Sequence, residues 1–150
     1  MVTVYDVPPN KLIEEVSKQM KSMDEIEEPE WSDFVKTGVH KEKGPEQPDW
    51  WFDRVSAIFR SVYVDGPIGV SKLKTKYGGK HSRGPRPEKF AKGSGSIVRE
   101  GLQQLESANF VEKTDNGRVV TSEGQSFLDD ISRDIMEEMA KDDPEMSKYL

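Results

Sequence analysis

The sequence gathers its cationic side chains in one short stretch, KLKTKYGGKHSRGPRPEKFAKGSGS, which covers residues 72–96. Eight lysine or arginine residues occur there, against one acidic residue, Glu88. Lysine and arginine neutralise phosphate groups, and glycine lets a backbone approach those groups closely. Because glycine and proline interrupt the charges, the stretch suits the irregular backbone of a folded RNA. The residues predicted to bind RNA here are Lys72, Lys74, Lys76, Lys80, His81, Arg83, Arg86, Lys89 and Lys92.

Aromatic residues lie among and beside these charges. Tyr77 and Phe90 either stack on unpaired bases or anchor the stretch to the core. Trp50, Arg54 and Ser61 are spaced i, i+4 and i+11, on the side of a predicted helix that faces away from its apolar stripe. Trp50 with Arg54 forms a plausible pair for base stacking and phosphate contact. The alternative is that Trp50 packs against the N-terminal helices.

The charge is distributed in three blocks. Residues 54–99 carry eleven basic and two acidic side chains, a net charge of +9, within a chain of net charge −6. The segments on either side are acidic, at −7 for residues 1–53 and −8 for residues 100–150. Asymmetry of this size concerns binding partners more than fold. A polyanion-binding surface is the main interpretation, and a solvated basic loop that balances its acidic neighbours is the alternative.

The residues needed for catalysis or metal binding are scarce. There is no cysteine, and the two histidines are His40 and His81, which favours neither a nucleophilic triad nor a zinc site. A phosphate-binding loop requires G-x-x-x-x-G-K-[ST], but Lys74 replaces its first glycine and His81 its hydroxyl residue. We therefore expect no enzyme, no cofactor, no metal and no small-molecule substrate.

The composition favours a soluble protein of the cytoplasm. An absence of cysteine fits a reducing compartment. No apolar run approaches the roughly 20 residues that span a bilayer. The N-terminal residues MVTVYDVPPNK do not have the pattern of a signal peptide. We expect no association with a membrane.

These side chains need a scaffold, and apolar spacing predicts one that is mostly helical. Asn116-Gly117 predicts a β-hairpin turn, and Ser122 with Gln125 matches a capping box. Residues 78–95 read as an irregular loop, and residues 40–49 as another. Helices are predicted over residues 8–23, 29–38, 50–64, 71–77, 96–109 and 122–143.

The predicted order over residues 49–121 is helix, short strand, helix, helix and hairpin, which is that of a winged helix. Residues 96–109 occupy the recognition-helix position and the hairpin is the wing. We expect a single domain over residues 1–150. In it, residues 1–48 pack N-terminal helices on this core, and residues 122–150 add a C-terminal helix and tail.

A winged helix also raises the alternative of a DNA-binding transcription regulator. The wing has Lys113 and Arg118 beside Asp115, and the recognition-position helix offers one arginine against two glutamates. That composition disfavours reading of base sequence and favours binding to backbone shape. A protein-interaction adaptor that uses the acidic ends is a third class. The helix positions predicted to face outward are Arg99, Glu100, Gln103, Gln104, Glu106 and Ser107.

Several motifs resemble those of a known family, the archaeal and eukaryotic small-subunit ribosomal proteins called nineteen-e. They cover nearly the whole chain in order. The most specific are YGGKHSRG at 77–84 and GSGSIVREGLQQLE at 93–106. The others are PEW at 29–31, HKE at 40–42, WF followed by Arg54 at 51–54, and VEK with a later GR at 111–118.

The resemblance implies a non-catalytic protein on a winged-helix core, bound to ribosomal RNA in the head of the small subunit. It also implies a role in late subunit maturation, neighbouring small-subunit ribosomal proteins as partners, and ribosome association in the cytoplasm. Family RNA-contacting positions match this sequence at Trp50, Arg54, Arg60 and Arg99, and in the basic stretch.

Overall fold

The computed structural model describes residues 2–38, 40–41, 43–45 and 49–149, and in them the fold is mostly α-helical. Of the loop predicted over 40–49, Glu42 and residues 46–48 lie outside the described residues. No helix in the described part is both long and apolar enough to cross a membrane. The α-helices are α1 (Pro9–Met20), α2 (Trp50–Asp65), α3 (Val70–Lys76), α4 (Gly95–Ser107) and α5 (Ser122–Asp142). The strands are β1 (Gly79–Arg83), β2 (Arg86–Ala91), β3 (Val111–Thr114) and β4 (Gly117–Val120), and the 3-10 helices are η1 (Val4–Asp6), η2 (Glu30–Asp33) and η3 (Pro144–Tyr149).

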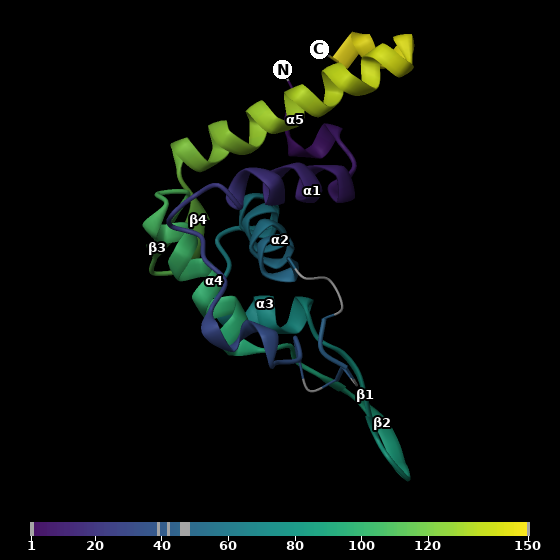
Figure 1. Cartoon of the computed structure of the whole chain (residues 1–150), viewed down its shortest axis with the longest axis vertical. Helices are drawn as coiled ribbons and strands as arrows, with labels where there is room; N and C mark the ends of the chain where they lie inside the picture. Colours follow the sequence, from purple (N-terminus) through teal and green to yellow (C-terminus); the bar gives the residue numbers. More distant parts are fainter. Residues whose placement is uncertain (1, 39, 42, 46–48, 150) are drawn as a thin grey trace.

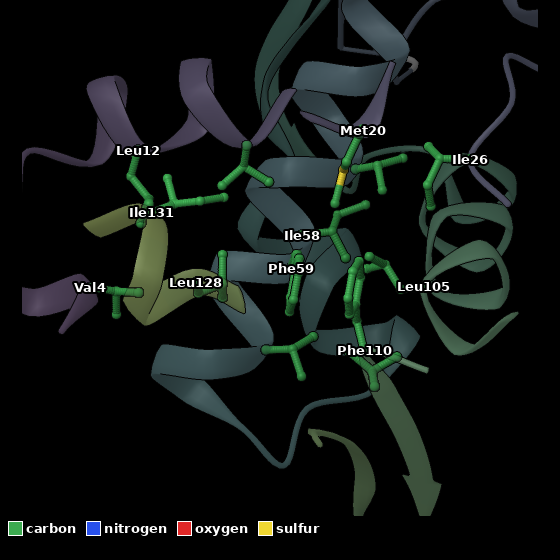
Figure 2. Packing of buried hydrophobic residues seen from close by; sticks show 14 of the residues in the cluster. Val4, Leu12, Met20, Ile26, Ile58, Phe59, Leu105, Phe110, Leu128 and Ile131 are labelled. Carbon is green, nitrogen blue, oxygen red and sulfur yellow. The ribbon is translucent and has the colours of Figure 1, made fainter. Parts of the chain in front are cut away.

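Helix α2 lies at the centre of the core and packs against α1, α4 and β4 (Figure 1). Its Phe59 is fully buried and stacks on Phe110, with ring centroids 5.0 Å apart, and Phe110 in turn meets Phe127 at 4.7 Å. Leu12 of α1 and Leu128 of α5 are also fully buried and close the core from the other side (Figure 2). Burying a side chain of this size stabilises the folded state by about 1.5–3 kcal/mol. Because these side chains belong to one apolar cluster, their burial holds the terminal helices against the central ones.

The winged-helix arrangement predicted for residues 49–121 is present. The extended segment at Ile68 pairs with β4, because Ile68 N donates to Arg118 O at 3.1 Å and Arg118 N donates to Ile68 O at 2.8 Å. Strands β3 and β4 form the wing in antiparallel register, from Val111 opposite Val120 to Thr114 opposite Gly117. The hairpin predicted from Asn116-Gly117 is present, but its two turn residues are Asp115 and Asn116. Gly117 begins β4 opposite Thr114 with φ of 128°, a conformation that glycine adopts readily.

The prediction of an irregular loop over residues 78–95 was wrong. Residues 79–91 form a second antiparallel hairpin, β1–β2, in which Arg83 pairs with Arg86 across the two-residue turn Gly84-Pro85. Gly84 has φ of 71°. A two-residue turn with glycine in this conformation at its first central position has a backbone twist that matches the twist of the flanking strands. The hairpin extends from the α3–α4 end of the molecule, away from α5 (Figure 1). We call it the basic hairpin.

Two helix boundaries also differ from prediction. The helix predicted over 29–38 is reduced to η2, because the chain beyond it extends to pair with the start of α4: Ser94 N donates to Thr37 O at 2.9 Å. The N-cap of α5 is Thr121 rather than Ser122. Thr121 Oγ1 accepts from Gly124 N at 3.1 Å and donates to Asn109 O at 2.6 Å, so the same hydroxyl also fixes the end of α4.

Candidate RNA interface

The basic hairpin presents its side chains to solvent, with residues 82–90 all exposed. Lys80 lies opposite Phe90, and His81 lies opposite Lys89. Because paired residues project from the same face of a hairpin, these two pairs lie on opposite faces. The hairpin therefore carries cationic groups on both faces, which suits contact with phosphates on more than one side.

Contacts within the hairpin fix some of its cations and leave others open. Lys80 Nζ pairs with Glu88 Oε2 at 2.6 Å, across the strands. The Arg83 guanidinium donates to Pro87 O at 2.9 Å from Nε and 2.6 Å from Nη2, which ties the tip together. Among the described residues, no side-chain hydrogen bond or ion pair is made by Arg86 or Lys89 of the hairpin, or by Lys92 just beyond it, which leaves their donors open for phosphate oxygens.

The foot of the hairpin is held by the N-terminal segment. Gly38 and Gly93 form an isolated antiparallel bridge, and Gly93 N donates to Lys74 O at 2.8 Å. The His40 ring packs against Gly79, where an added Cβ would lie 2.9 Å from His40 Cδ2. Burial lowers the pKa of His40, with further lowering by nearby Lys41, Arg54 and His81. This lowered pKa favours the neutral form of His40 at the base of the basic hairpin.

The two aromatic residues of the basic stretch have different environments. Tyr77 is half-buried, and its hydroxyl lies 3.3 Å from Ser61 Oγ of α2. Its ring therefore anchors the base of the hairpin to the core, as one of the two alternatives predicted. Phe90 is 52% exposed, with one end of its ring over the backbone of Gly78. Its side chain is therefore exposed and available for stacking.

The predicted pair Trp50 and Arg54 lies at the N-terminal end of α2. Trp50 is buried: its Nε1 donates to Ser32 O at 3.2 Å, so the indole packs on the N-terminal segment. Arg54 lies with its Cζ 4.3 Å from the centroid of the Tyr77 ring. Burial lowers the pKa of Arg54, offset in part by Tyr77, although the guanidinium remains charged because its pKa starts far above neutral.

The remaining predicted residues lie on three helices. Lys72, Lys74 and Lys76 lie on α3, where Lys76 pairs with Asp65 at 3.1 Å. The other two are Arg60, which is half-buried on α2 with its Nε unpartnered among the described residues, and Arg99, which is exposed on α4. Lys72 through Lys92 thus lie on or beside the hairpin, while Arg60 and Arg99 lie on separate elements.

Helix α4 is less able to read a DNA groove than its sequence suggests. Gln104, predicted to face outward, is only 9% exposed. Its Oε1 accepts from Trp51 Nε1 at 3.0 Å, and its Nε2 donates to Glu27 O at 2.8 Å. The amide ties α4 to α2 and to the N-terminal segment, because a buried indole N–H requires an acceptor. Among the α4 positions that were predicted to face outward, Arg99 is the one cation.

Sequence reasoning did not identify His40, Gln104, Lys41 or Lys43 as parts of the interface or its support. Lys41 and Lys43 line a cavity with Trp50 and Arg54. Their charge was visible in the sequence, but the surrounding residues read as a solvated loop. The burial of Gln104 had no sequence signal, because its position falls beside the apolar stripe of α4.

The fold and the site together define a winged-helix protein with a basic hairpin inserted before its recognition-position helix. Residues 3–138 match the sequence model of the family described as Ribosomal protein S19e. The Haloarcula marismortui protein named small ribosomal subunit protein eS19 is 46% identical over 154 residues, covering 99% of both chains. The Thermoplasma acidophilum eS19 is 42% identical over all of both chains, and the Schizosaccharomyces pombe eS19A is 41% identical over 91% of this chain and 96% of its own. The chain belongs to the ribosomal protein S19e family, which confirms the predicted resemblance and places it among ribosomal proteins rather than enzymes.

Proposed function

We propose that this protein is a structural constituent of the small ribosomal subunit that binds ribosomal RNA through the basic hairpin. The names of its relatives support the assignment to the small subunit, because each is named as a small ribosomal subunit protein. The observation that carries RNA binding is the hairpin itself, which exposes residues 82–90 and extends away from the helical body (Figure 1). Two of its cations, Arg86 and Lys89, have side chains without a protein partner among the described residues.

The distribution of charge favours RNA over DNA. A winged helix that reads DNA places a polar or basic helix in the major groove. Here α4 contributes Arg99, while Gln104 is committed to Trp51. The cations lie instead on a projecting hairpin that can follow an irregular phosphate backbone. Contacts of this kind position a protein on nucleic acid without reading its sequence.

The salt dependence of RNA binding tests this proposal. The double variant Arg86→Glu with Lys89→Glu, which replaces the two hairpin cations without side-chain partners among the described residues, should weaken binding to purified small-subunit ribosomal RNA. It should also make the slope of log K against log salt shallower by about 2, because each lost phosphate contact contributes about one unit. Lys113→Glu with Lys141→Glu is the matched control, since it makes the same change in net charge on exposed residues away from the hairpin. An unchanged slope in the hairpin variant would contradict the proposal.

We also propose the finer assignments that the resemblance implies. The protein occupies the head of the small subunit beside other small-subunit ribosomal proteins and supports late maturation. It associates with ribosomes in the cytoplasm. Trp50, Arg54, Arg60 and Arg99 add contacts to those of the hairpin. Crosslinking of this chain to ribosomal RNA in purified small subunits tests the location, and crosslinks confined to the body of the subunit would contradict it.

A further inference from the structure

A cavity of about 510 Å³ opens at the foot of the basic hairpin. Helix α2 forms one wall with Trp50, Asp53 and Arg54, and Tyr77 closes the side next to the hairpin. Lys41 and Lys43, from the segment before α2, also line the cavity and are exposed. The volume falls within the range of about 300–1,000 Å³ typical of small-ligand sites. The cavity therefore has room for a group the size of one nucleotide.

The aromatic walls of this cavity are fixed before any ligand arrives. Trp50 is held by the bond of its Nε1 to Ser32 O and by an edge-to-face contact with Trp51, at 5.7 Å between centroids. Tyr77 is held through its hydroxyl by Ser61, which also donates to Ala57 O at 2.9 Å. Rigid aromatic surfaces favour stacking, because little side-chain entropy is lost on binding.

Arg54 is the half-buried cation of this cavity, and its hydrogen-bonding capacity is unused within the described part of the chain. Its guanidinium has five N–H donors, yet among the described residues its one observed contact is the face of Tyr77. A charged group withdrawn from water is costly unless it is hydrogen-bonded. The Tyr77 ring holds the guanidinium in place, and its donors remain open to a ligand that brings acceptor atoms.

The surrounding charges indicate which ligand fits. Lys41 and Lys43, without ion pairs among the described residues, supply charge for a phosphate. Asp53 is the acidic residue of the lining and offers an acceptor to the amino or imino groups of a base. Unpaired bases in RNA stack on aromatic rings and on arginine planes, and are hydrogen-bonded on their edges. These are the properties of a site for a nucleotide whose base is no longer stacked on its neighbours in the RNA.

We infer that this cavity receives one unpaired nucleotide extruded from the RNA that the basic hairpin binds. The base stacks in the cavity beside Tyr77 and Arg54, and the adjoining phosphate meets Lys41 or Lys43. The inference rests on the proposed RNA binding and adds a preference for RNA with a bulge or an open loop. The hairpin supplies contacts to the backbone, and the cavity adds discrimination between paired and unpaired RNA.

Binding of the full chain to two RNA duplexes tests the inference. One is a perfect 12-base-pair duplex, and the other is the same duplex with a single bulged nucleotide, made with each of the four bases. We expect at least one bulged duplex to bind about tenfold more tightly, the effect of one base stacked on a side chain. Equal affinity for the perfect duplex and all four bulged duplexes would overturn the inference.

Matched variants assign the preference to the cavity. Arg54→Lys keeps the charge but loses the planar group, and Tyr77→Leu removes the ring. Each should bring the ratio of bulged to perfect affinity close to one. The hairpin variant Arg86→Glu with Lys89→Glu should weaken both duplexes and keep the ratio. A ratio that survives Arg54→Lys and Tyr77→Leu, in protein with an unchanged unfolding temperature, would place the nucleotide elsewhere.

The two proposals fail in different ways. If neither duplex binds, or if the hairpin variant binds both as well as the unmodified chain does, the proposed function itself is wrong, and the cavity inference falls with it. If both duplexes bind equally and depend on the hairpin, RNA binding stands and the cavity inference alone is wrong.

Discussion

Single side chains connect the helices of this protein to the interface that they support. Gln104 is the clearest case, because one amide satisfies the indole of Trp51 and the backbone of Glu27. Its Oε1 also accepts from Glu27 N at 3.3 Å. The N-terminal segment that contributes Trp31 and His40 is thereby fixed to the winged-helix core. Residues outside the candidate interface can in this way determine where the residues of that interface lie.

Replacing Gln104 should destabilise the protein. The variant Gln104→Leu leaves the buried Trp51 N–H and the Glu27 backbone without partners, at about 1–3 kcal/mol for each unsatisfied group. We expect the free energy of unfolding in urea to fall by about 2–4 kcal/mol. Gln103→Leu is the control on the exposed side of the same helix, and it should change the free energy of unfolding by less than about 0.5 kcal/mol. Equal stability of the two variants would show that the amide is not required.

At the scale of elements, the basic hairpin explains how a loop-like sequence acquires order. Its strands are exposed on both faces, so they lack the alternation of apolar and polar residues that identifies a strand with one buried face. The order comes from pairing between strands, from a glycine turn, and from the bridge of Gly38 to Gly93 at its foot. The hairpin can therefore be rigid without contributing to the core.

The turn at Gly84 should control the hairpin separately from the fold. Open space surrounds the position of a Cβ at Gly84, so a substitution is limited by its φ of 71° alone. Gly84→Val should cost about 1–2 kcal/mol of hairpin stability, whereas Gly84→Asn should be tolerated, since asparagine adopts this conformation more readily.

Amide hydrogen exchange measures this difference. We expect faster exchange across Lys80–Phe90 in Gly84→Val than in Gly84→Asn, with the unfolding temperature of the core unchanged in both. The same protection in the two variants would show that strand pairing does not depend on the turn.

How far the sequence predicts this structure depends on where each element lies. The helices with apolar stripes, the Asn116-Gly117 wing and the order of the winged helix were predicted correctly, because each buries one face or follows a specific turn signal. The basic hairpin was missed because glycine, proline and charge read as a loop. The sequence feature that could have indicated this hairpin is the two-residue turn Gly84-Pro85 between Arg83 and Arg86. The role of Gln104 depends on a partner 53 residues away, which spacing within one helix does not reveal.

Across the whole molecule, opposite charges lie at opposite ends. The basic hairpin extends from one end and the acidic helix α5 lies at the other (Figure 1). Near a polyanion such an arrangement orients the protein with the hairpin toward the RNA and α5 away from it, because the field acts on the two ends in opposite directions. The net charge of −6 therefore does not argue against the proposed RNA binding, since the segment that contains the candidate interface, residues 54–99, carries a local charge of +9.

Sedimentation of cell extract through a sucrose gradient tests the central claim, that this chain is a small-subunit protein bound through its basic hairpin. The account predicts that the unmodified chain travels with small subunits and intact ribosomes. The variant Arg86→Glu with Lys89→Glu should shift toward the top of the gradient, although its core remains folded. An unmodified chain that stays at the top, or a hairpin variant that travels with small subunits as fully as the unmodified chain does, would contradict the account.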